Sequence, residues 1–133
     1  MAQPPAEAAL ALVERWNRGE RSAPAELVDP AVELQSPFSS VAGEPYRGYD
    51  GIERWARDVD DQFSQWRMEV DDVSTHDGRA LVLGTVHARG RGSDIELSQA
   101  AATVVDFAAD GRVKRLRFYV DVDAARDAVR PGR

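Results

Sequence analysis

Cysteine is absent from this 133-residue sequence, and so is any long apolar run. Without thiols the chain can form neither disulfides nor thiolate metal sites, which is typical of cytoplasmic proteins. No stretch approaches the roughly 20 apolar residues that a membrane-spanning helix needs. The N-terminus, MAQPPAEAALALVERW, lacks the basic start and the apolar segment of a signal peptide. We therefore expect a soluble, cytoplasmic protein.

Basic charge is also scarce. Acidic residues outnumber basic residues by 23 to 17, the formal net charge is −6, and Lys114 is the single lysine. Because phosphate recognition needs a net basic surface, we expect neither nucleic acid nor a membrane as partner. The acidic run Asp58–Asp61 spreads around a helix, and no group of His, Asp and Glu has metal-ligand spacing. We therefore expect no metal site and no cofactor.

The length and composition fit one globular domain. Hydrophobic residues make up 43% of the chain and charged residues 30%, which is typical of a folded protein. A chain of this length buries about two thirds of the surface of its unfolded state. We predict a single domain over residues 1–133, with its core at about 7–129.

The first half of the chain shows helical spacing. Apolar residues from Ala9 to Trp16 recur at i, i+3, i+4 and i+7, which predicts an amphipathic helix that ends at Gly19. Ser22 can cap a short second helix that ends at Asp29-Pro30. A strand at 31–37 follows.

The stretch from Ser36 to Trp55 connects that strand to a third helix, which we predict from Asp50, as its N-cap, to about residue 65. The stretch carries Phe38, Tyr46 and Tyr49 between glycine and proline breaks. These rings can form the rim of a pocket or simply pack the loop onto the domain, and one ring can do both.

The spacing changes to a period of two after Trp66. Asp77-Gly78 predicts a hairpin between strands at 67–76 and 79–90, and Asp110-Gly111 predicts a second one between 94–107 and 112–120. Asp121 or Asp123 can cap a terminal helix. The order of elements predicts an α+β fold in which the early helices cover one face of a curved antiparallel sheet.

Alternation assigns the faces of the last strands. Leu116, Phe118 and Val120 form the inner set, and Arg115, Arg117 and Tyr119 the outer set. On the preceding strand the inner set runs from Ile95 to Phe107 and includes two polar residues, Gln99 and Thr103. Burying an amide or a hydroxyl costs a few kcal/mol unless it is hydrogen-bonded. A cavity that holds a ligand or water would satisfy both groups.

The two histidines carry little of the expected chemistry. His76 lies beside the Asp77-Gly78 turn, where we expect it to be solvated. His87 lies in mid-strand, and either the set that contains it or the set of Ala80, Val82 and Val86 can face inward. We favour His87 on the convex face, over a role in proton transfer.

The order and spacing of several segments resemble the SnoaL-like group of the nuclear transport factor 2-like superfamily, which includes ketosteroid isomerase. The resemblance covers about Glu7 to Val129, in the pieces ERWNRGE, LVDPAVELQSP, YRGYDGIERWARDVDDQF, DGRALVLGTVHARGRGS and DGRVKRLRFYVDVDAA. It implies a cone-shaped, cystatin-like fold in which a bent sheet wraps around three helices and encloses an apolar cavity. Family members are commonly dimers, and they include cyclases, isomerases, epoxide hydrolases, dehydratases and proteins that only bind ligands.

The resemblance also gives positions for catalytic groups, and these positions hold other residues here. The base of ketosteroid isomerase matches Ser36, the oxyanion tyrosine matches Leu12, and the oxyanion acid matches Thr103. The acid and histidine of SnoaL-type cyclases match Thr103 and Phe118, and the Arg-x-Asp of the epoxide hydrolases is missing. Catalytic residues therefore stay unknown, and ketosteroid isomerisation is not expected.

A cavity for a hydrophobic ligand is what the resemblance and the inner faces predict together. We place it between the third helix and the concave face of the sheet. Trp16 and Trp55 can be cavity wall or ordinary core, and we favour wall. The predicted ligand-binding residues are Trp16, Ser36, Phe38, Tyr46, Trp55, Val59, Phe63, Gln99, Thr103 and Phe118.

Three functions follow from this reading of the chain. The first is binding of a small hydrophobic molecule of polyketide, terpenoid or steroid-like kind. The second is cofactor-independent catalysis on such a molecule, as a cyclase, isomerase or dehydratase. The third is an interaction module that uses the convex sheet face.

We predict a homodimer that pairs through this convex face. This face carries three small residues beside two arginines and a tyrosine, a combination that suits a close contact with a polar rim. The six residues are Ala100, Ala102, Val104, Arg115, Arg117 and Tyr119. Light scattering at micromolar concentration should give twice the mass of one chain. A mass equal to that of one chain would contradict the prediction.

Overall fold

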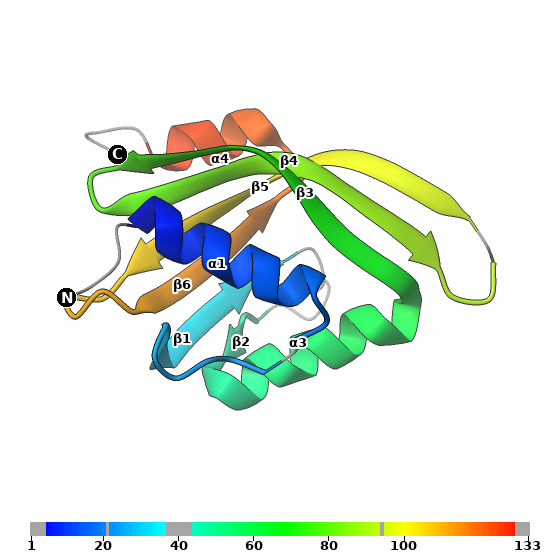
Figure 1. The fold of residues 1–133 in the computed structure, drawn as a ribbon, viewed down its shortest axis with the longest axis horizontal. Helices are drawn as coiled ribbons and strands as arrows, with labels where there is room; N and C mark the ends of the chain where they lie inside the picture. The colour runs from blue at the N-terminus through cyan, green and yellow to red at the C-terminus, as the bar shows by residue number, and fades with distance from the viewer. Residues whose placement is uncertain (1–4, 21, 37–43, 94, 130–133) are drawn as a thin grey trace.

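The computed structural model describes residues 5–20, 22–36, 44–93 and 95–129. Within these ranges, three helices, α1 (Pro5–Asn17), α3 (Gly48–Gln62) and α4 (Val122–Ala128), accompany one curved, unclosed sheet (Figure 1). The sheet has the order β2-β1-β6-β5-β4-β3. Its strands are β1 (Val28–Gln35), β2 (Tyr46–Arg47), β3 (Phe63–His76), β4 (Arg79–Gly90), β5 (Glu96–Phe107) and β6 (Val113–Tyr119). No helix in the described ranges is long and apolar enough to span a membrane.

The predicted α+β architecture is confirmed, and the sheet differs from the prediction in one pairing. The strands from β3 to β6 are antiparallel, as expected. β1 instead lies parallel to β6, with Leu34 beside Leu116, so the sheet is mixed. The short strand β2, which pairs with Glu33 and Leu34 of β1, was not predicted, because two residues are too few to show a period.

The predicted second helix is wrong. The backbone N–H groups of Leu27 and Val28 both donate to the carbonyl of Pro24, which closes a single turn. β1 then begins at Val28, because the carbonyl of Leu27 accepts a hydrogen bond from Val113 of β6. Pairing with a distant strand therefore overrides the local helix signal.

The ends of the third helix also differ from the prediction. α3 begins at Gly48, two residues before Asp50, and its N-cap, Arg47, makes no side-chain capping bond. The helix ends at Gln62, where β3 begins. At the other end of the chain the predicted cap is confirmed, since the Asp121 carboxylate accepts from the N–H groups of Asp123 and Ala124.

Backbone geometry bends the β3–β4 hairpin. Asp77 and Gly78 have φ angles of 50° and 77°, which is the mirror-image turn predicted for this hairpin. Further along, β3 has a bulge between Val70 and Asp72, opposite Gly84. A Cβ atom at Gly84 would lie 2.1 Å from the carbonyl oxygen of Glu69, so only glycine fits. This close approach gives the sheet the curvature that leaves room on its concave face.

The two faces of the sheet bury separate cores. On the concave side, Val82, Val105 and Val113 pack together with Ala9 of α1. On the convex side, α4 covers a smaller cluster that includes Leu81, Ala102, Val104 and Ala125. Ala102 and Val104 are therefore buried within one chain, which narrows the convex surface that the predicted dimer can use. Ala100 and Arg115 stay exposed.

A carboxylate surrounded by arginines joins three strands on the convex face. Asp106 of β5 is almost fully buried and lies 3.1 Å from Arg79, 3.4 Å from Arg117 and 3.5 Å from Arg115. One negative charge thus compensates three positive charges from neighbouring strands. Removing the negative charge would leave the arginines facing one another.

We predict that Asp106→Asn lowers the free energy of unfolding by about 1–3 kcal/mol. The loss stays below that of a fully buried pair because two of the three arginines are more than a third exposed and screened by water. Urea unfolding followed by circular dichroism measures the effect. Asp110→Asn is the matched control, since Asp110 pairs with Arg112 at the surface. Equal midpoints for the two variants would contradict the prediction.

A tyrosine hydroxyl ties β2 to α3. Tyr46 donates a hydrogen bond of 2.5 Å to the carboxylate of Asp58. Burial, this hydrogen bond and the negative charge of Asp58 raise the pKa of Tyr46 to about 12, against a weaker opposite effect of Arg54. The folded state therefore favours the neutral phenol.

We predict that this stabilisation is complete below about pH 10 and declines as the pH rises from there through about 12. The sign follows because the folded-state pKa lies above the unfolded-state value, so deprotonation favours unfolding. Titration of phenolate absorbance should show a late step that Tyr46→Phe removes. Asp58→Asn should move that step to lower pH. A late step that persists in Tyr46→Phe would contradict the assignment.

Candidate functional site

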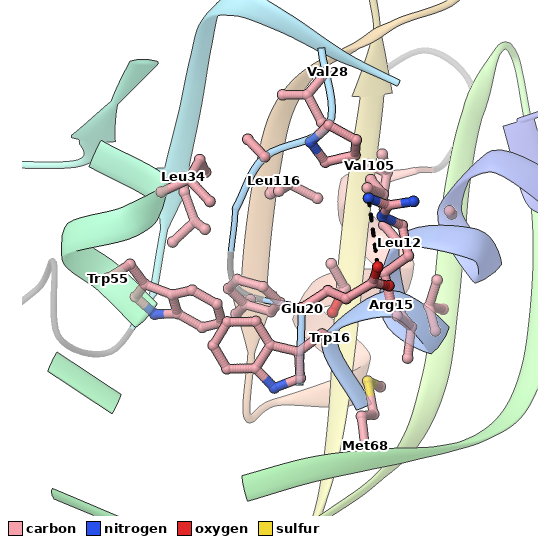
Figure 2. A pocket seen from close by; sticks show the side chains of 18 of the residues that line it. Leu12, Arg15, Trp16, Glu20, Val28, Leu34, Trp55, Met68, Val105 and Leu116 are labelled. Atoms are coloured by element: carbon pink, nitrogen blue, oxygen red, sulfur yellow. Dashed lines mark ion pairs between the residues drawn. The ribbon is translucent and has the colours of Figure 1, made fainter. Parts of the chain in front are cut away.

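Two cavities lie on the concave side of the sheet. The first, which we name the α1 cavity, has a volume of about 100 Å³ and lies between α1, the segment that follows it and the sheet (Figure 2). The second, which we name the β5 cavity, has a volume of about 260 Å³ and lies between the end of α3 and the first half of β5. Both are lined mainly by apolar side chains.

The two cavities share one wall. The residues that line both are Trp55, Trp66, Met68, Thr103 and Phe118. They come from α3, β3, β5 and β6, so the wall forms only when these elements meet. A ligand in either cavity would touch this wall.

Aromatic rings give the shared wall its shape. Trp55 stacks on Phe118 with ring centres 5.1 Å apart and planes at 9°. Trp16 of α1 lies 4.5 Å from Trp55, and both rings meet the edge of Trp66 at 86°. Such stacked and edge-to-face pairs contribute beyond the area that they bury. The cluster therefore packs four aromatic rings together where the two cavities meet.

The end of α1 is fixed against the edge strand β3. The Asn17 amide donates to the carbonyl of Met68 over 2.8 Å and accepts from its N–H over 3.0 Å. The indole N–H of Trp16 donates to the carbonyl of Trp66 at 3.3 Å. These bonds use backbone groups of β3, which has no further strand beside it. They hold Trp16 in the aromatic cluster.

Most of the predicted ligand-binding residues line a cavity. Trp16 lines the α1 cavity, and Ser36, Val59, Phe63 and Gln99 line the β5 cavity. Trp55, Thr103 and Phe118 line both, whereas Phe38 lies outside the described residues. Tyr46 lines neither cavity. It packs against the cluster of Leu34, Trp55 and Val59, with its hydroxyl on Asp58.

The polar groups of the cavities differ from the expectation in one respect. Thr103 is 3% exposed, and its hydroxyl has no hydrogen-bond partner within the described part of the chain. Ser36 is also buried. Gln99 lines the β5 cavity but is exposed rather than buried, because the sheet extends past the helices at this end. Its amide can therefore be hydrated without a ligand.

A second unpaired donor belongs to the shared wall. The indole N–H of Trp55 is buried and has no hydrogen-bond partner in the described ranges. Buried donors without partners are rare and call for an explanation such as water or a ligand.

The three positions that the resemblance assigned to catalytic groups do converge on the cavities. Leu12 lines the α1 cavity, Ser36 the β5 cavity and Thr103 both. No carboxylate or histidine is found among the described residues that line the β5 cavity. Tyr119 reaches that cavity, but its hydroxyl accepts from Arg117 at 3.4 Å. Tyr119 is thus the one titratable side chain among the described residues that line this cavity, whereas general acid–base catalysis most often uses histidine or a carboxylate.

Sequence reasoning missed an ion pair at the α1 cavity. Arg15 and Glu20 line it together, with Arg15 Nη2 3.9 Å from Glu20 Oε1 (Figure 2). Gly19, with φ of 90°, turns the chain so that the N–H of Glu20 bonds to the carbonyl of Arg15. The predicted helix end at Gly19 was thus the available signal for this pair.

The remaining candidates lie away from both cavities. His87 is on the convex face, as predicted, where it contacts Ser98 at 2.9 Å and Glu69 at 3.3 Å. His76 bonds to Ser74 next to the hairpin turn. Across the part of the chain that the structure describes, no group of three or more His, Asp and Glu could hold a metal ion.

Comparison with solved structures identifies the fold. A nuclear transport factor 2-like protein of unknown function from Burkholderia pseudomallei superposes with a TM-score of 0.77 and 17% identity, covering 96% of this chain and 98% of the other. TerC, crystallised with polyporic acid, superposes with a TM-score of 0.77 and 18% identity, covering 96% of this chain and 98% of the other. A protein from Jannaschia, assigned provisionally as a SnoaL-like polyketide cyclase, superposes with a TM-score of 0.71 and 18% identity. The superposition covers 96% of this chain and 92% of the other.

Comparison of the sequence identifies the family. No curated protein matches this chain significantly. The family model of the SnoaL-like domain matches residues 9–116, which is most of the chain and runs from within α1 to within β6. The chain therefore belongs to the SnoaL-like domain family.

Proposed function

We propose that this chain binds a small hydrophobic molecule, of polyketide, terpenoid or steroid-like kind, in the two cavities. The observation that carries the proposal is the shared wall. It offers the flat faces of Trp55, Trp66 and Phe118 and a single buried hydroxyl, that of Thr103. Binding sites for organic ligands combine such apolar walls with a few polar groups.

The cavity volumes indicate which part of a ligand each cavity would hold. An engineered cavity of about 150 Å³ in another protein holds benzene, so the β5 cavity, at about 260 Å³, has room for the larger body of a ligand. The α1 cavity, at about 100 Å³, suits a smaller part. A ligand that contacts both would be held by the shared wall.

Two relatives support this choice of ligand class. The structure of TerC contains polyporic acid, and the Jannaschia protein is assigned to polyketide cyclases. At 18% identity they share the fold with this chain, and proteins of one fold can differ in ligand and activity.

Cofactor-independent catalysis is the second candidate function, as a cyclase, isomerase or dehydratase. It is favoured by the family and by the position of Thr103, whose free hydroxyl faces both cavities. Such catalysis would depend on positioning and on neutral hydrogen bonds from Ser36, Gln99 or Thr103. Mass spectrometry of a bound polyketide after incubation separates the two functions: an unchanged ligand supports binding alone, and a product supports catalysis.

We predict that Thr103→Trp weakens binding of N-phenyl-1-naphthylamine, a neutral probe that fluoresces in apolar sites, by at least about tenfold, or ~1.4 kcal/mol. The indole ring of the new tryptophan fills empty space on both sides of the shared wall. The substitution should therefore lower the free energy of unfolding by less than the roughly 1–3 kcal/mol that overpacking a full core costs. Fluorescence titration and thermal unfolding measure the two effects.

Ala100→Trp is the matched control, because Ala100 lies on the same strand, is exposed and faces the other side of the sheet. It should leave probe binding unchanged. If Thr103→Trp unfolds the protein or binds the probe like wild type, the cavities are not the binding site.

A further inference from the structure

Arg15 is a cation at the solvent side of an otherwise apolar cavity. The α1 cavity is lined by Leu12, Val13 and other apolar side chains over most of its surface, whereas its exposed lining residues are Glu20 and Ser22. These two mark the side that opens to water. The side chain of Arg15 is 30% exposed, so it lies between the opening and the interior.

The charges at this opening are unbalanced. Glu20 lies 3.3 Å from Arg18 and only 3.9 Å from Arg15, so it is bonded to Arg18 and weakly paired with Arg15. Two guanidinium groups therefore share one carboxylate. The guanidinium of Arg15 makes no hydrogen bond to the described residues, and its Nε is buried without a partner.

A structural role explains only part of this arrangement. A basic residue in the last turn of a helix interacts favourably with the helix dipole, and Arg15 is in that turn of α1. That role is fulfilled by a fully hydrated side chain. That role leaves the buried, unpaired Nε unexplained, since buried donors without partners are rare. It also leaves the partly exposed guanidinium of a cavity-lining residue without a hydrogen-bond acceptor in the described ranges.

We propose that the α1 cavity takes the acidic end of its ligand, so that the ligand is a hydrophobic organic acid whose carboxylate, or similar anion, pairs with Arg15. This inference rests on the proposed function, because it names the chemical class of the molecule bound in the same cavities. Glu20 stays on Arg18, and the apolar body of the acid lies along Trp16 and the shared wall.

The negative net charge of the chain does not favour an acidic ligand, so a preference for one would depend on local cations. At −6 the protein as a whole repels anions, so an organic acid gains nothing from the general field. Selection of an acid over a neutral analogue then depends on cations at the opening, and of Arg15 and Arg18 only Arg15 lines the cavity. The planar guanidinium also suits a carboxylate, which it can bind through two parallel hydrogen bonds.

The test compares two probes of the same shape, 2-naphthoate and 2-naphthamide, by titration calorimetry on the full chain. Wild type should bind the naphthoate at least about tenfold more tightly, since charge-assisted hydrogen bonds are the stronger ones. Arg15→Gln should abolish that preference by weakening the naphthoate alone. Glu20→Gln should strengthen naphthoate binding, because a competing carboxylate is removed.

Arg126→Gln is the charge-matched control, since Arg126 lies on α4 at the other face of the sheet. It should change neither affinity by more than about twofold. Equal binding of the two probes by wild type, or a preference that survives Arg15→Gln, would overturn this inference and leave the proposed function standing. If wild type binds neither probe, both fail.

Discussion

The attachment of α1 to the edge of β3 is the constraint on which the rest of the site depends. The side-chain amide of Asn17 pairs with both backbone groups of Met68, as a neighbouring strand would. It ends the sheet at β3 and fixes the last turn of α1 over the concave face. Trp16, one residue earlier, then reaches Trp55 and Trp66. Without this attachment Trp16 would be lost from its contacts with Trp55 and Trp66.

The bend of the sheet is the second feature on which the cavities depend. Gly84 lets the bulge in β3 approach β4 so closely that a Cβ atom has no room, and the hairpin curves over the helices. Curvature creates more volume than the helices fill. Small side chains on β5, such as Ala101 and Thr103, leave part of that volume empty, and the aromatic wall divides it into the two cavities.

The chemistry of the cavities depends on the residues at the positions where the resemblance placed catalytic groups. Leu12, Ser36 and Thr103 line the cavities without supplying a group that titrates near neutral pH. Recognition of the ligand that we propose would therefore depend on shape, on aromatic faces, on a few neutral donors and on Arg15. The charges that do line a cavity, Arg15 and Glu20, are partly exposed to solvent and line the same cavity as the shared wall.

The sequence by itself determined the features that depend on near neighbours in the chain. The stripe of α1, the Asp77-Gly78 turn, the Asp121 cap and the alternation that turns Phe118 inward all follow from backbone dihedral preferences and side-chain periodicity. The family resemblance added the matching positions at Leu12, Ser36 and Thr103. Only the tertiary structure decided that β1 lies parallel to β6, that α4 covers Ala102 and Val104, and that Arg15 meets Glu20 at a cavity. The first two features join segments far apart in the chain. The third needs a cavity, which is the small difference between the volume that the elements enclose and the volume that they fill, and no local pattern encodes that difference.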